Sequence, residues 1–286
     1  MGNNPLISVV ILTWNRKEEV LKAIHSVLNQ KYKNIEIVVV DNHSTDGTFE
    51  ALNTLVREHP NIKLIRTYKN LGCPIGRNIA MANASGDIIF SLDDDAEIDN
   101  NCLEEVVKTF NDFPTAAVVA CKIEEENSSR KNYETVRKVG VFSGGGFAIK
   151  RDVLKEVGFF PDYFRQAEET YLALKILDKG YDIIYNPNCK IYHKPSPKGR
   201  VRYDIIYYGF RHDIENVFRL LPIKYALPIA IYKLVPHFKN YIRNGFMLSF
   251  FKDVFGVILN GISKSKLENE KIKFETFLLY RKLNRR

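Results

Sequence analysis

The chain has 286 residues, 45% of them hydrophobic, so it can hold one large α/β domain or two small ones around a full core. Residues 1–199 carry 25 Lys and Arg against 27 Asp and Glu, whereas residues 200–286 carry 17 against 7, which indicates a near-neutral body followed by a basic region with a separate task. Four widely spaced cysteines without a CxxC pair argue against a disulfide frame and a zinc site, so we expect scattered free thiols. The N-terminal residues have no basic stretch followed by an apolar one, which argues against a secretory signal, so we expect a cytoplasmic protein.

Apolar runs and helical patterns alternate through the first hundred residues. The predicted strands are 7–12, 35–40, 62–65 and 87–92, and the predicted helices between them are 17–30, about 48–58 and 77–83. We expect an Asx or Ser/Thr cap at the start of the second helix. This alternation is typical of a mostly parallel sheet with helices on both faces.

The pattern is less regular between residues 100 and 200. We expect a helix at 103–112, a strand at 116–123 and a polar surface loop at 124–131. A glycine-rich turn then runs into a strand over 142–149, and a helix over 172–179 ends at Gly180. Two short strands follow at 183–185 and 190–193.

Polar loops follow three of the predicted strands, at 13–16, 41–47 and 93–95. The carboxyl ends of parallel strands share one edge of a sheet, so these loops should gather around one ligand crevice. The loop at 93–95 holds three adjacent aspartates, and burying an unpaired carboxylate is costly. Hard oxygen ligands of this kind suit Mg²⁺ or Mn²⁺, although a solvated acidic turn is the alternative for the triplet taken alone.

The order of these motifs resembles the inverting family 2 glycosyltransferases of the GT-A fold, and above all bacterial surface-polysaccharide enzymes, including rhamnosyltransferase-like members. The matching pieces lie within about residues 5–220 and are 9–16 (VVILTWNR), 40–48 (VDNHSTDGT), 70–78 (NLGCPIGRN), 92–95 (LDDD), 144–151 (GGGFAIKR), 168–169 (EE) and 192–193 (YH). The resemblance implies a metal-dependent enzyme that moves a sugar from a UDP- or dTDP-sugar to a hydroxyl of a glycan or lipid-linked acceptor.

The resemblance also assigns roles on the nucleotide side. It implies that Asp41 accepts a hydrogen bond from the base, a role that suits a group that only accepts, and that Thr13 and Asn15 line the same pocket. A turn or helix-cap aspartate is the plain alternative for Asp41. Arg16 is either part of the pocket or a solvated residue at the start of a helix.

For the diphosphate, the resemblance implies a divalent ion, Mn²⁺ or Mg²⁺, held by Asp95 with Asp93 and His193. Asp93 would also lie near the ribose, and Asp94 would face the ribose or the sugar. Arg77, near a helix start, would contact the diphosphate, or else make a structural ion pair with Asp93 or Asp95.

On the acceptor side, the resemblance places Gly145 at the border of donor sugar and acceptor, Glu169 as catalytic base and Glu168 against the sugar or acceptor. A tight turn before a strand is the plain alternative for the glycines. The alternative for the two glutamates is a pair of exposed acids at a helix N-terminus. Tyr171 departs from the family pattern, which often has Asp there, and this puts the sugar-side contacts in doubt.

We expect a catalytic domain over 1–202, with a nucleotide-binding half at 1–98 and an acceptor half at 99–202, followed by a basic, amphipathic helical region at 203–286. Lys198 and Arg200 would belong to a basic loop that closes over the diphosphate, or to a solvated charge run. Apolar residues recur at helical spacing between 247 and 262, and the apolar run before them is interrupted by prolines. No uncharged apolar run is long enough to span a membrane. The helical region packs on the body or on a second subunit, or else lies on an anionic membrane at the inner face of the cell.

Three other functions are less well supported. A sugar-nucleotide-forming nucleotidyltransferase would need a glycine-rich, basic loop after the first strand, where this chain has Thr13 to Arg16. A non-catalytic sugar-nucleotide or membrane-binding protein would not need the acidic triplet and the glutamate pair. A nucleic-acid partner is not expected, because the basic region carries no recognised nucleic-acid motif.

Overall fold

The computed structural model describes residues 4–125, 132–196, 201–267 and 270–284. A mixed nine-stranded sheet forms its centre, with the order β3-β2-β1-β4-β8-β6-β9-β5 and β7 paired to β9. The strands are β1 (Ile7–Thr13), β2 (Ile35–Asp41), β3 (Ile62–Arg66), β4 (Ile88–Asp93), β5 (Ala96–Ile98), β6 (Ala116–Glu125), β7 (Arg137–Lys138), β8 (Gly146–Lys150) and β9 (Asp182–His193).

Strand direction divides the sheet into two parts. Strands β1 to β4 run parallel to one another, and β6 runs parallel to β9. Strand β8 lies between these groups and is antiparallel to both β4 and β6. The carboxyl ends of β1, β2 and β4 therefore share one edge, as the sequence predicts.

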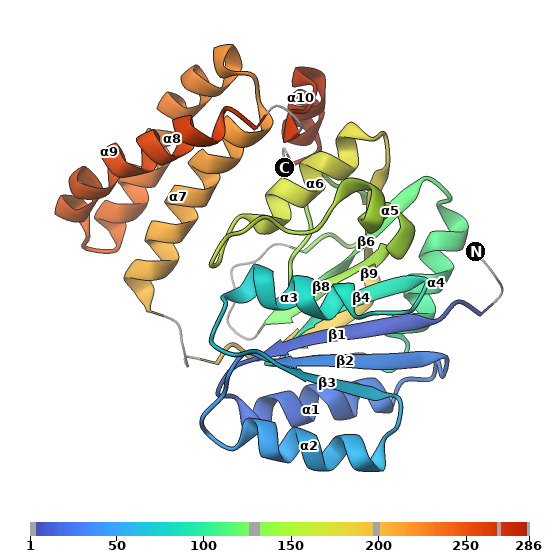
Figure 1. Cartoon of the computed structure of the whole chain (residues 1–286). Coiled ribbons are helices and arrows are strands. Elements are labelled where there is room, and N and C mark those ends of the chain that lie inside the picture. The colour runs from blue at the N-terminus through green and yellow to red at the C-terminus, as the bar shows by residue number, and fades with distance from the viewer. Residues whose placement is uncertain (1–3, 126–131, 197–200, 268–269, 285–286) are drawn as a thin grey trace.

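Helices cover both faces of the sheet (Figure 1). Helices α1 (Lys17–Leu28), α2 (Thr48–Glu58) and α4 (Cys102–Asp112) contribute to one apolar core. Helices α3 (Cys73–Ala82), α5 (Arg151–Val157) and α6 (Glu168–Asp178) contribute to the core on the other face. The predicted α/β architecture with a largely parallel sheet and flanking helices is confirmed.

Several element boundaries differ from the prediction. Helix α3 begins at Cys73 rather than 77, because Pro74 in its first turn needs no hydrogen-bond acceptor there. Helix α6 begins at Glu168 rather than 172. Its first turn was not predicted because it is polar and carries no apolar repeat. The two short strands after it are one strand, β9, with a register shift where a break was expected. Strand β5 and helix α5 were not predicted.

Two local predictions were wrong. Helix α2 is preceded by Gly47 in a left-handed conformation instead of an Asx or Ser/Thr cap, and Asp46 accepts hydrogen bonds from the Thr48 amide and hydroxyl one residue earlier. The cysteines are free, as expected, but they are not scattered. Cys102, Cys121 and Cys189 are all buried and close enough to hydrogen-bond with one another. Strands β6 and β9 and helix α4 bring them together.

The C-terminal part is helical, as predicted, and consists of α7 (Arg202–Leu220), α8 (Ile223–Arg243), α9 (Met247–Lys264) and α10 (Phe274–Leu283). Helices α7, α8 and α9 pack together beside the sheet domain and share a third apolar core with α6 and α10 (Figure 1). Pro228 and Pro236 lie inside α8 on its exposed side and do not end the helix. No helix in the described part of the chain is long and apolar enough to cross a bilayer.

Candidate active site

A cleft of about 470 Å³ opens where the carboxyl ends of β1 and β4 face the turn that precedes α6. It brings together most of the residues that the sequence singled out. Those that line it are Thr13, Arg16, Arg77, Asp93, Asp94, Asp95, Gly145, Glu168, Glu169 and His193.

One end of the cleft carries a group of metal-binding type. Asp93, Asp95 and His193 each offer a ligand atom, and these atoms lie within 4.8 Å of one another. His193 reaches this position because β9 pairs with β5, where Ala96 and His193 are partners in the register. The short strand β5 turns the chain back directly behind the acidic triplet, so strand pairing brings the histidine to the two carboxylates.

The hydrogen bonds around Asp95 keep it ionised. Burial raises the pKa of this carboxyl, but hydrogen bonds from His193 at 3.1 Å and from the Ser196 amide at 2.9 Å, together with Arg16, lower its pKa to about 2. The hydrogen bond to Asp95 in turn raises the pKa of His193. An ionised carboxylate next to an imidazole is a suitable ligand pair for a divalent ion.

Asp94, whose role the sequence left open, faces Arg16. The Arg16 Nη1 atom lies 2.6 Å from Asp94 Oδ1 and 3.1 Å from Asp95 Oδ2. Burial raises the pKa of Asp94 to about 6, although Arg16 works against this. Arg16 is thus a half-buried counter-ion of the acidic triplet and not a solvated residue.

Arg77 links the two acidic groups of the cleft. It lies on α3 and is 7% exposed. Its guanidinium is paired with Asp93, and its Nη1 atom lies 3.5 Å from Glu168 Oε1. The ion pair that the sequence left as an alternative is therefore present, and the residue also lines the cleft.

The two glutamates at the start of α6 differ in environment. Glu168 is 3% exposed, and its Oε2 atom is buried with no hydrogen-bond partner in the described chain. Burial, reinforced by repulsion from Glu169, raises the pKa of Glu168 to about 8. Glu169 accepts a hydrogen bond of 2.9 Å from the Gly144 amide. The pair is therefore not two exposed helix-terminal acids.

The glycine-rich turn before β8 makes this arrangement possible. A Cβ atom on Gly144 would lie 2.5 Å from Glu169 Oε1, and one on Gly145 would overlap the Asp93 carboxylate. Only glycines allow the backbone to pass this close to both acids. The turn therefore determines how far Asp93 lies from Glu169.

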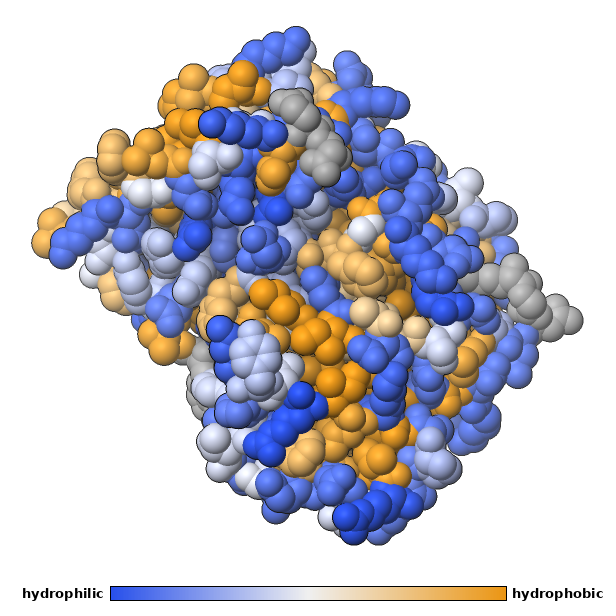
Figure 2. Space-filling model, in the orientation of Figure 1, coloured by the Kyte–Doolittle hydropathy of each residue, from blue (hydrophilic) through white to orange (hydrophobic). Residues whose placement is uncertain are grey.

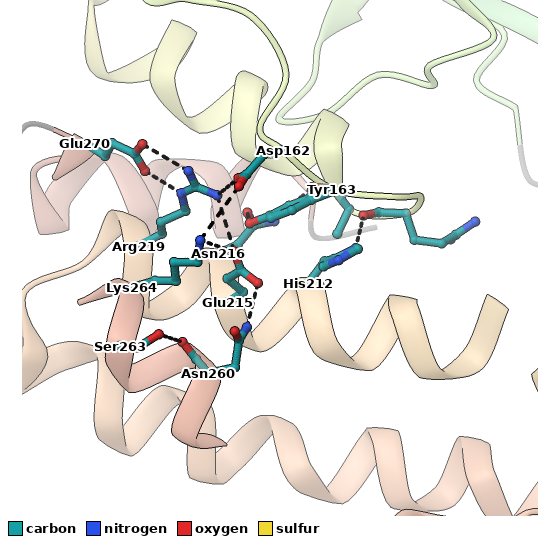
Figure 3. A network of polar contacts seen from close by, with 12 residues as sticks. Asp162, Tyr163, His212, Glu215, Asn216, Arg219, Asn260, Ser263, Lys264 and Glu270 are labelled. Carbon is teal, nitrogen blue, oxygen red and sulfur yellow. Dashed lines mark hydrogen bonds and ion pairs between the residues drawn. The ribbon is translucent and has the colours of Figure 1, made fainter. Parts of the chain in front are cut away.

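A strained turn places the glutamate pair. Gln166 and Ala167, immediately before α6, have left-handed φ angles of 70° and 67°, which are unfavourable for residues with a side chain. Helix α7 holds this turn: His212 Nδ1 donates to the Arg165 carbonyl at 2.6 Å, and Asn216 Nδ2 donates to the Ala167 carbonyl at 2.8 Å (Figure 3).

His212 and Asn216 of α7 also contact Tyr163. Its ring stacks on His212 with centroids 4.0 Å apart, and its hydroxyl donates to Asn216 Oδ1 at 2.7 Å (Figure 3). Burial lowers the pKa of His212 to about 4, so the imidazole is neutral at neutral pH. Carbonyl oxygens only accept, so the proton of the neutral ring must be on Nδ1.

Some predicted site residues lie outside the cleft wall. Asp41 is fully buried, where it accepts a hydrogen bond from the Ser44 amide at 3.1 Å and lies 3.3 Å from Arg66 Nε. Asn15 accepts from the Thr45 amide at 2.8 Å and so ties two loops together. Lys198 and Arg200 lie outside the described residues.

The sequence reasoning missed several residues of the site. Trp14 and Asn42 line the cleft next to predicted residues, and a rule that included every polar or aromatic residue in a strand-end loop would have found them. His212 and Asn216 could not be found in this way, because they lie more than forty residues after the turn that they hold and show no motif.

Comparison with known proteins identifies relatives along most of the chain. The family model described as Glycosyl transferase family 2 matches residues 8–168. An uncharacterized glycosyltransferase of Haemophilus influenzae is 28% identical over 59% of this chain and 76% of its own length. A Campylobacter jejuni GalNAc(5)-diNAcBac-PP-undecaprenol beta-1,3-glucosyltransferase is 31% identical over 63% of this chain and 62% of its own.

Solved structures share the fold. S. aureus TarS 1-349 in complex with UDP-GlcNAc has a TM-score of 0.67 at 20% identity, covering 96% of this chain and 83% of that one. A Pyrobaculum calidifontis mannosyltransferase in complex with GDP-Man and Mn²⁺ has a TM-score of 0.62 at 20% identity, covering 98% and 80%. At this level of identity the likeness concerns the fold alone.

Proposed function

This chain belongs to glycosyl transferase family 2 and has the GT-A fold, and we propose that it is a metal-dependent, inverting enzyme that moves a sugar from a UDP- or dTDP-sugar to a hydroxyl of a glycan or lipid-linked acceptor, in surface-polysaccharide synthesis. One observation carries the proposal. A three-ligand cation site and a pair of glutamates lie in the same cleft, on opposite sides of Arg77. Such a site can bind a leaving group at one end and remove a proton at the other.

The residues of the cation site fit Mn²⁺ or Mg²⁺. Two carboxylates supply hard oxygen ligands, and the imidazole of His193 suits the softer of these ions, Mn²⁺. Asp93, Asp95 and His193 would hold the ion, which when bound neutralises negative charge on a departing diphosphate. The P. calidifontis enzyme of the same fold was solved in complex with GDP-Man and Mn²⁺.

We assign the proton transfer to Glu169. The amide of Gly144 holds one carboxylate oxygen, which leaves the other for the acceptor hydroxyl. As the acceptor oxygen bonds to the anomeric carbon, its proton moves to Glu169, the bond from that carbon to the diphosphate breaks with its electrons going to the diphosphate, and the configuration inverts. Glu168, whose pKa is about 8, is protonated at neutral pH and can donate a hydrogen bond to a sugar oxygen.

On the nucleotide side, we place the base and ribose against Thr13, Trp14 and Asn42 at the ends of β1 and β2. Asp41 lies directly beside Thr13 in the strand register and supports this wall. We propose that Arg16, Arg77 and Asp94 surround the diphosphate and sugar, with the arginines turning from the carboxylates towards the phosphates when the donor binds.

The C-terminal helices suit an acceptor at a membrane. Large apolar side chains are exposed along α8 and α9, and Figure 2 shows apolar areas at this end of the molecule. The exposed side chains that we call the apolar surface are Leu227, Ile231, Val235, Leu248, Phe251, Phe255 and Leu259. Residues 223–266 carry seven Lys or Arg, with Asp253 as their one acid. We propose that this apolar surface contacts an anionic bilayer, as an enzyme with an undecaprenol-linked acceptor, such as that of the C. jejuni relative, would require.

A panel of UDP-, dTDP- and GDP-sugars tests the function. We expect one of them, in the presence of Mn²⁺, to raise the melting temperature and to be slowly hydrolysed. Glu169→Gln should keep this donor-induced shift and lose about a hundredfold or more in transfer rate, the contribution of a general base. Glu104→Gln, at an exposed position of α4, serves as the control. Absence of binding and hydrolysis with every donor contradicts the proposal, and full activity of Glu169→Gln contradicts the assignment of the base.

A further inference from the structure

A second cavity lies next to the active-site cleft. It has a volume of about 290 Å³ and is enclosed by the strained turn, α7 and α8. Gln166 and Ile205 line both cavities, so the two are adjacent across these side chains. Gln166 is exposed, and its side chain has no hydrogen-bond partner within the described chain. The cavity therefore meets the cleft three residues before Glu169, and Asp93, Asp95 and His193 are not part of its wall.

The wall of the second cavity combines an apolar base with fixed polar groups. Ile205, Ile206 and Phe210 of α7 form the base, and Asp213, His237 and Asn240 form the polar part. Lys233 Nζ lies 2.8 Å from both carboxylate oxygens of Asp213, and His237 Nε2 lies 2.9 Å from one of them. The acid is thus neutralised by α8 and held in one orientation.

These contacts exclude some ligands and favour others. None of the described residues in the cavity wall is an arginine, and the nearby Lys233 is already bound to Asp213, so the described wall offers little to a phosphate. His237 Nδ1 has no partner among the described residues, and the Asn240 amide is exposed. A histidine, an asparagine and a glutamine around an apolar base are suited to an uncharged ligand with several hydroxyls.

Gly209 leaves the cavity open. It lies in the middle of α7, where glycine costs about 1 kcal/mol relative to alanine. Outside the local backbone of α7, no described atom lies within 4 Å of where its Cβ would be. A side chain at this position would therefore enter the cavity without meeting a neighbour.

We propose that the second cavity is a carbohydrate subsite, which binds the sugar unit of the acceptor next to the one that receives the transferred sugar. This inference rests on the proposed glycosyltransferase function. The geometry carries it: the cavity borders the cleft at Gln166, three residues before Glu169, and Asp93, Asp95 and His193 of the cation site are not among the residues that line it. A ligand that reached from the cavity past Gln166 would present its next ring to Glu169.

Blocking the cavity tests the subsite. Saturation-transfer NMR is used to measure the binding of neutral p-nitrophenyl mono- and disaccharides, based on glucose, galactose, N-acetylglucosamine and rhamnose, to the protein with and without UDP and Mn²⁺. Gly209→Leu fills the cavity, and Gly256→Leu, at a glycine of α9 that also meets open space, is the matched control. Asn240→Ala removes a polar contact without adding bulk.

We expect at least one disaccharide to bind the wild type and Gly256→Leu more tightly than its monosaccharide does. Gly209→Leu should weaken this binding by about tenfold or more and abolish the difference between disaccharide and monosaccharide. Asn240→Ala should weaken it less. Donor hydrolysis should be the same in all four proteins, and its absence from the wild type would count against the proposed function instead. Equal disaccharide binding by Gly209→Leu and the wild type, or no disaccharide binding by the wild type, overturns the subsite.

Discussion

At the scale of single residues, the site depends on glycines without side chains as much as on the acidic side chains beside them. The acidic triplet, Glu169 and the glycine turn come from three distant parts of the chain, and the turn passes so close to the acids that no side chain fits. Gly145 is the more demanding position, because its Cβ would occupy the space of the Asp93 carboxylate. Asp93 could then keep neither its contact with Arg77 nor its distance to Asp95.

Gly145→Ala therefore should impair the cation site. We expect Mn²⁺ to raise the affinity for UDP in the wild type and to do so at least about tenfold less in the variant, measured by calorimetric titration. Gly256→Ala, which meets open space, should behave as the wild type. An unchanged Mn²⁺ effect in Gly145→Ala would show that Asp93 is not needed for the ion.

At the scale of elements, α7 holds the turn that leads into the glutamate pair. Its side chains His212 and Asn216 bind three successive carbonyls of the strained turn, which then leads directly into Glu168. A left-handed non-glycine residue costs about 1–3 kcal/mol and persists only where its surroundings hold it. His212 is thus a positioning residue.

The conservative substitution His212→Asn keeps a donor near Nδ1, whereas His212→Leu removes it. We expect His212→Leu to lower kcat about tenfold or more with little change in the donor KM, and His212→Asn to restore much of the loss. Equal activity of the two variants would contradict a positioning role.

His212 also predicts a pH dependence of stability. Its pKa is lowered in the folded protein to about 4 from an ordinary value of 6.5. As the pH falls, His212 therefore takes up a proton in the unfolded chain before it does so in the folded protein. The contribution of the neutral His212 to the free energy of unfolding is complete above about pH 6.5 and is lost as the pH falls towards 4. Relative to His212→Asn, the wild type should lose about 3 kcal/mol of unfolding free energy between pH 7 and pH 4, measured by urea denaturation.

At the scale of the whole molecule, the C-terminal helices are attached to the body by a polar network around the buried residues Arg219 and Glu215 (Figure 3). Arg219 of α7 lies 2.6 Å from Glu270 and 2.8 Å from Asp162, and Asn260 of α9 donates to Glu215 at 2.8 Å. Asp162 belongs to the segment that leads to the strained turn. The C-terminal helices are therefore joined to the segment that leads into Glu168 and Glu169.

Membrane binding is the prediction at this scale. The protein should sediment with vesicles that contain phosphatidylglycerol, and bind less as salt rises or when phosphatidylcholine is the sole lipid. The double variant Phe251→Ser/Phe255→Ser should lose at least about a hundredfold in affinity, since each buried phenylalanine contributes about 1.5–3 kcal/mol. Tyr68→Ser, at an exposed position on the body, is the control.

The alternative to membrane binding is a dimer in which a second subunit covers the apolar surface. If the wild type is a dimer in solution, does not bind vesicles, and becomes monomeric in the double variant, then a second subunit covers the surface. Like charges on α8 and α9 would have to face one another in such a dimer, which disfavours it at low salt.

The sequence by itself determined the order of strands and helices in the first half and the edge of the sheet where the cleft opens. Both follow from local rules: apolar periodicity selects the element, and parallel strands carry their polar ends to one edge. The motifs around Asp93, Gly145 and Glu169 also had a recognisable order, and these residues now lie in one cleft.

Only the tertiary structure decided the rest. It shows Asp94 facing Arg16, Asp41 beneath the cleft wall, and α7 holding the turn before Glu168. Pro228 and Pro236, which interrupt the apolar run in the sequence, lie within the continuous helix α8. The second cavity is formed where α7 and α8 meet a turn that is distant from them in sequence. These features depend on contacts between distant segments of the chain. Such contacts leave no periodic signal in the sequence, because the position of each residue in the folded protein, and not its sequence neighbours, determines what it contacts.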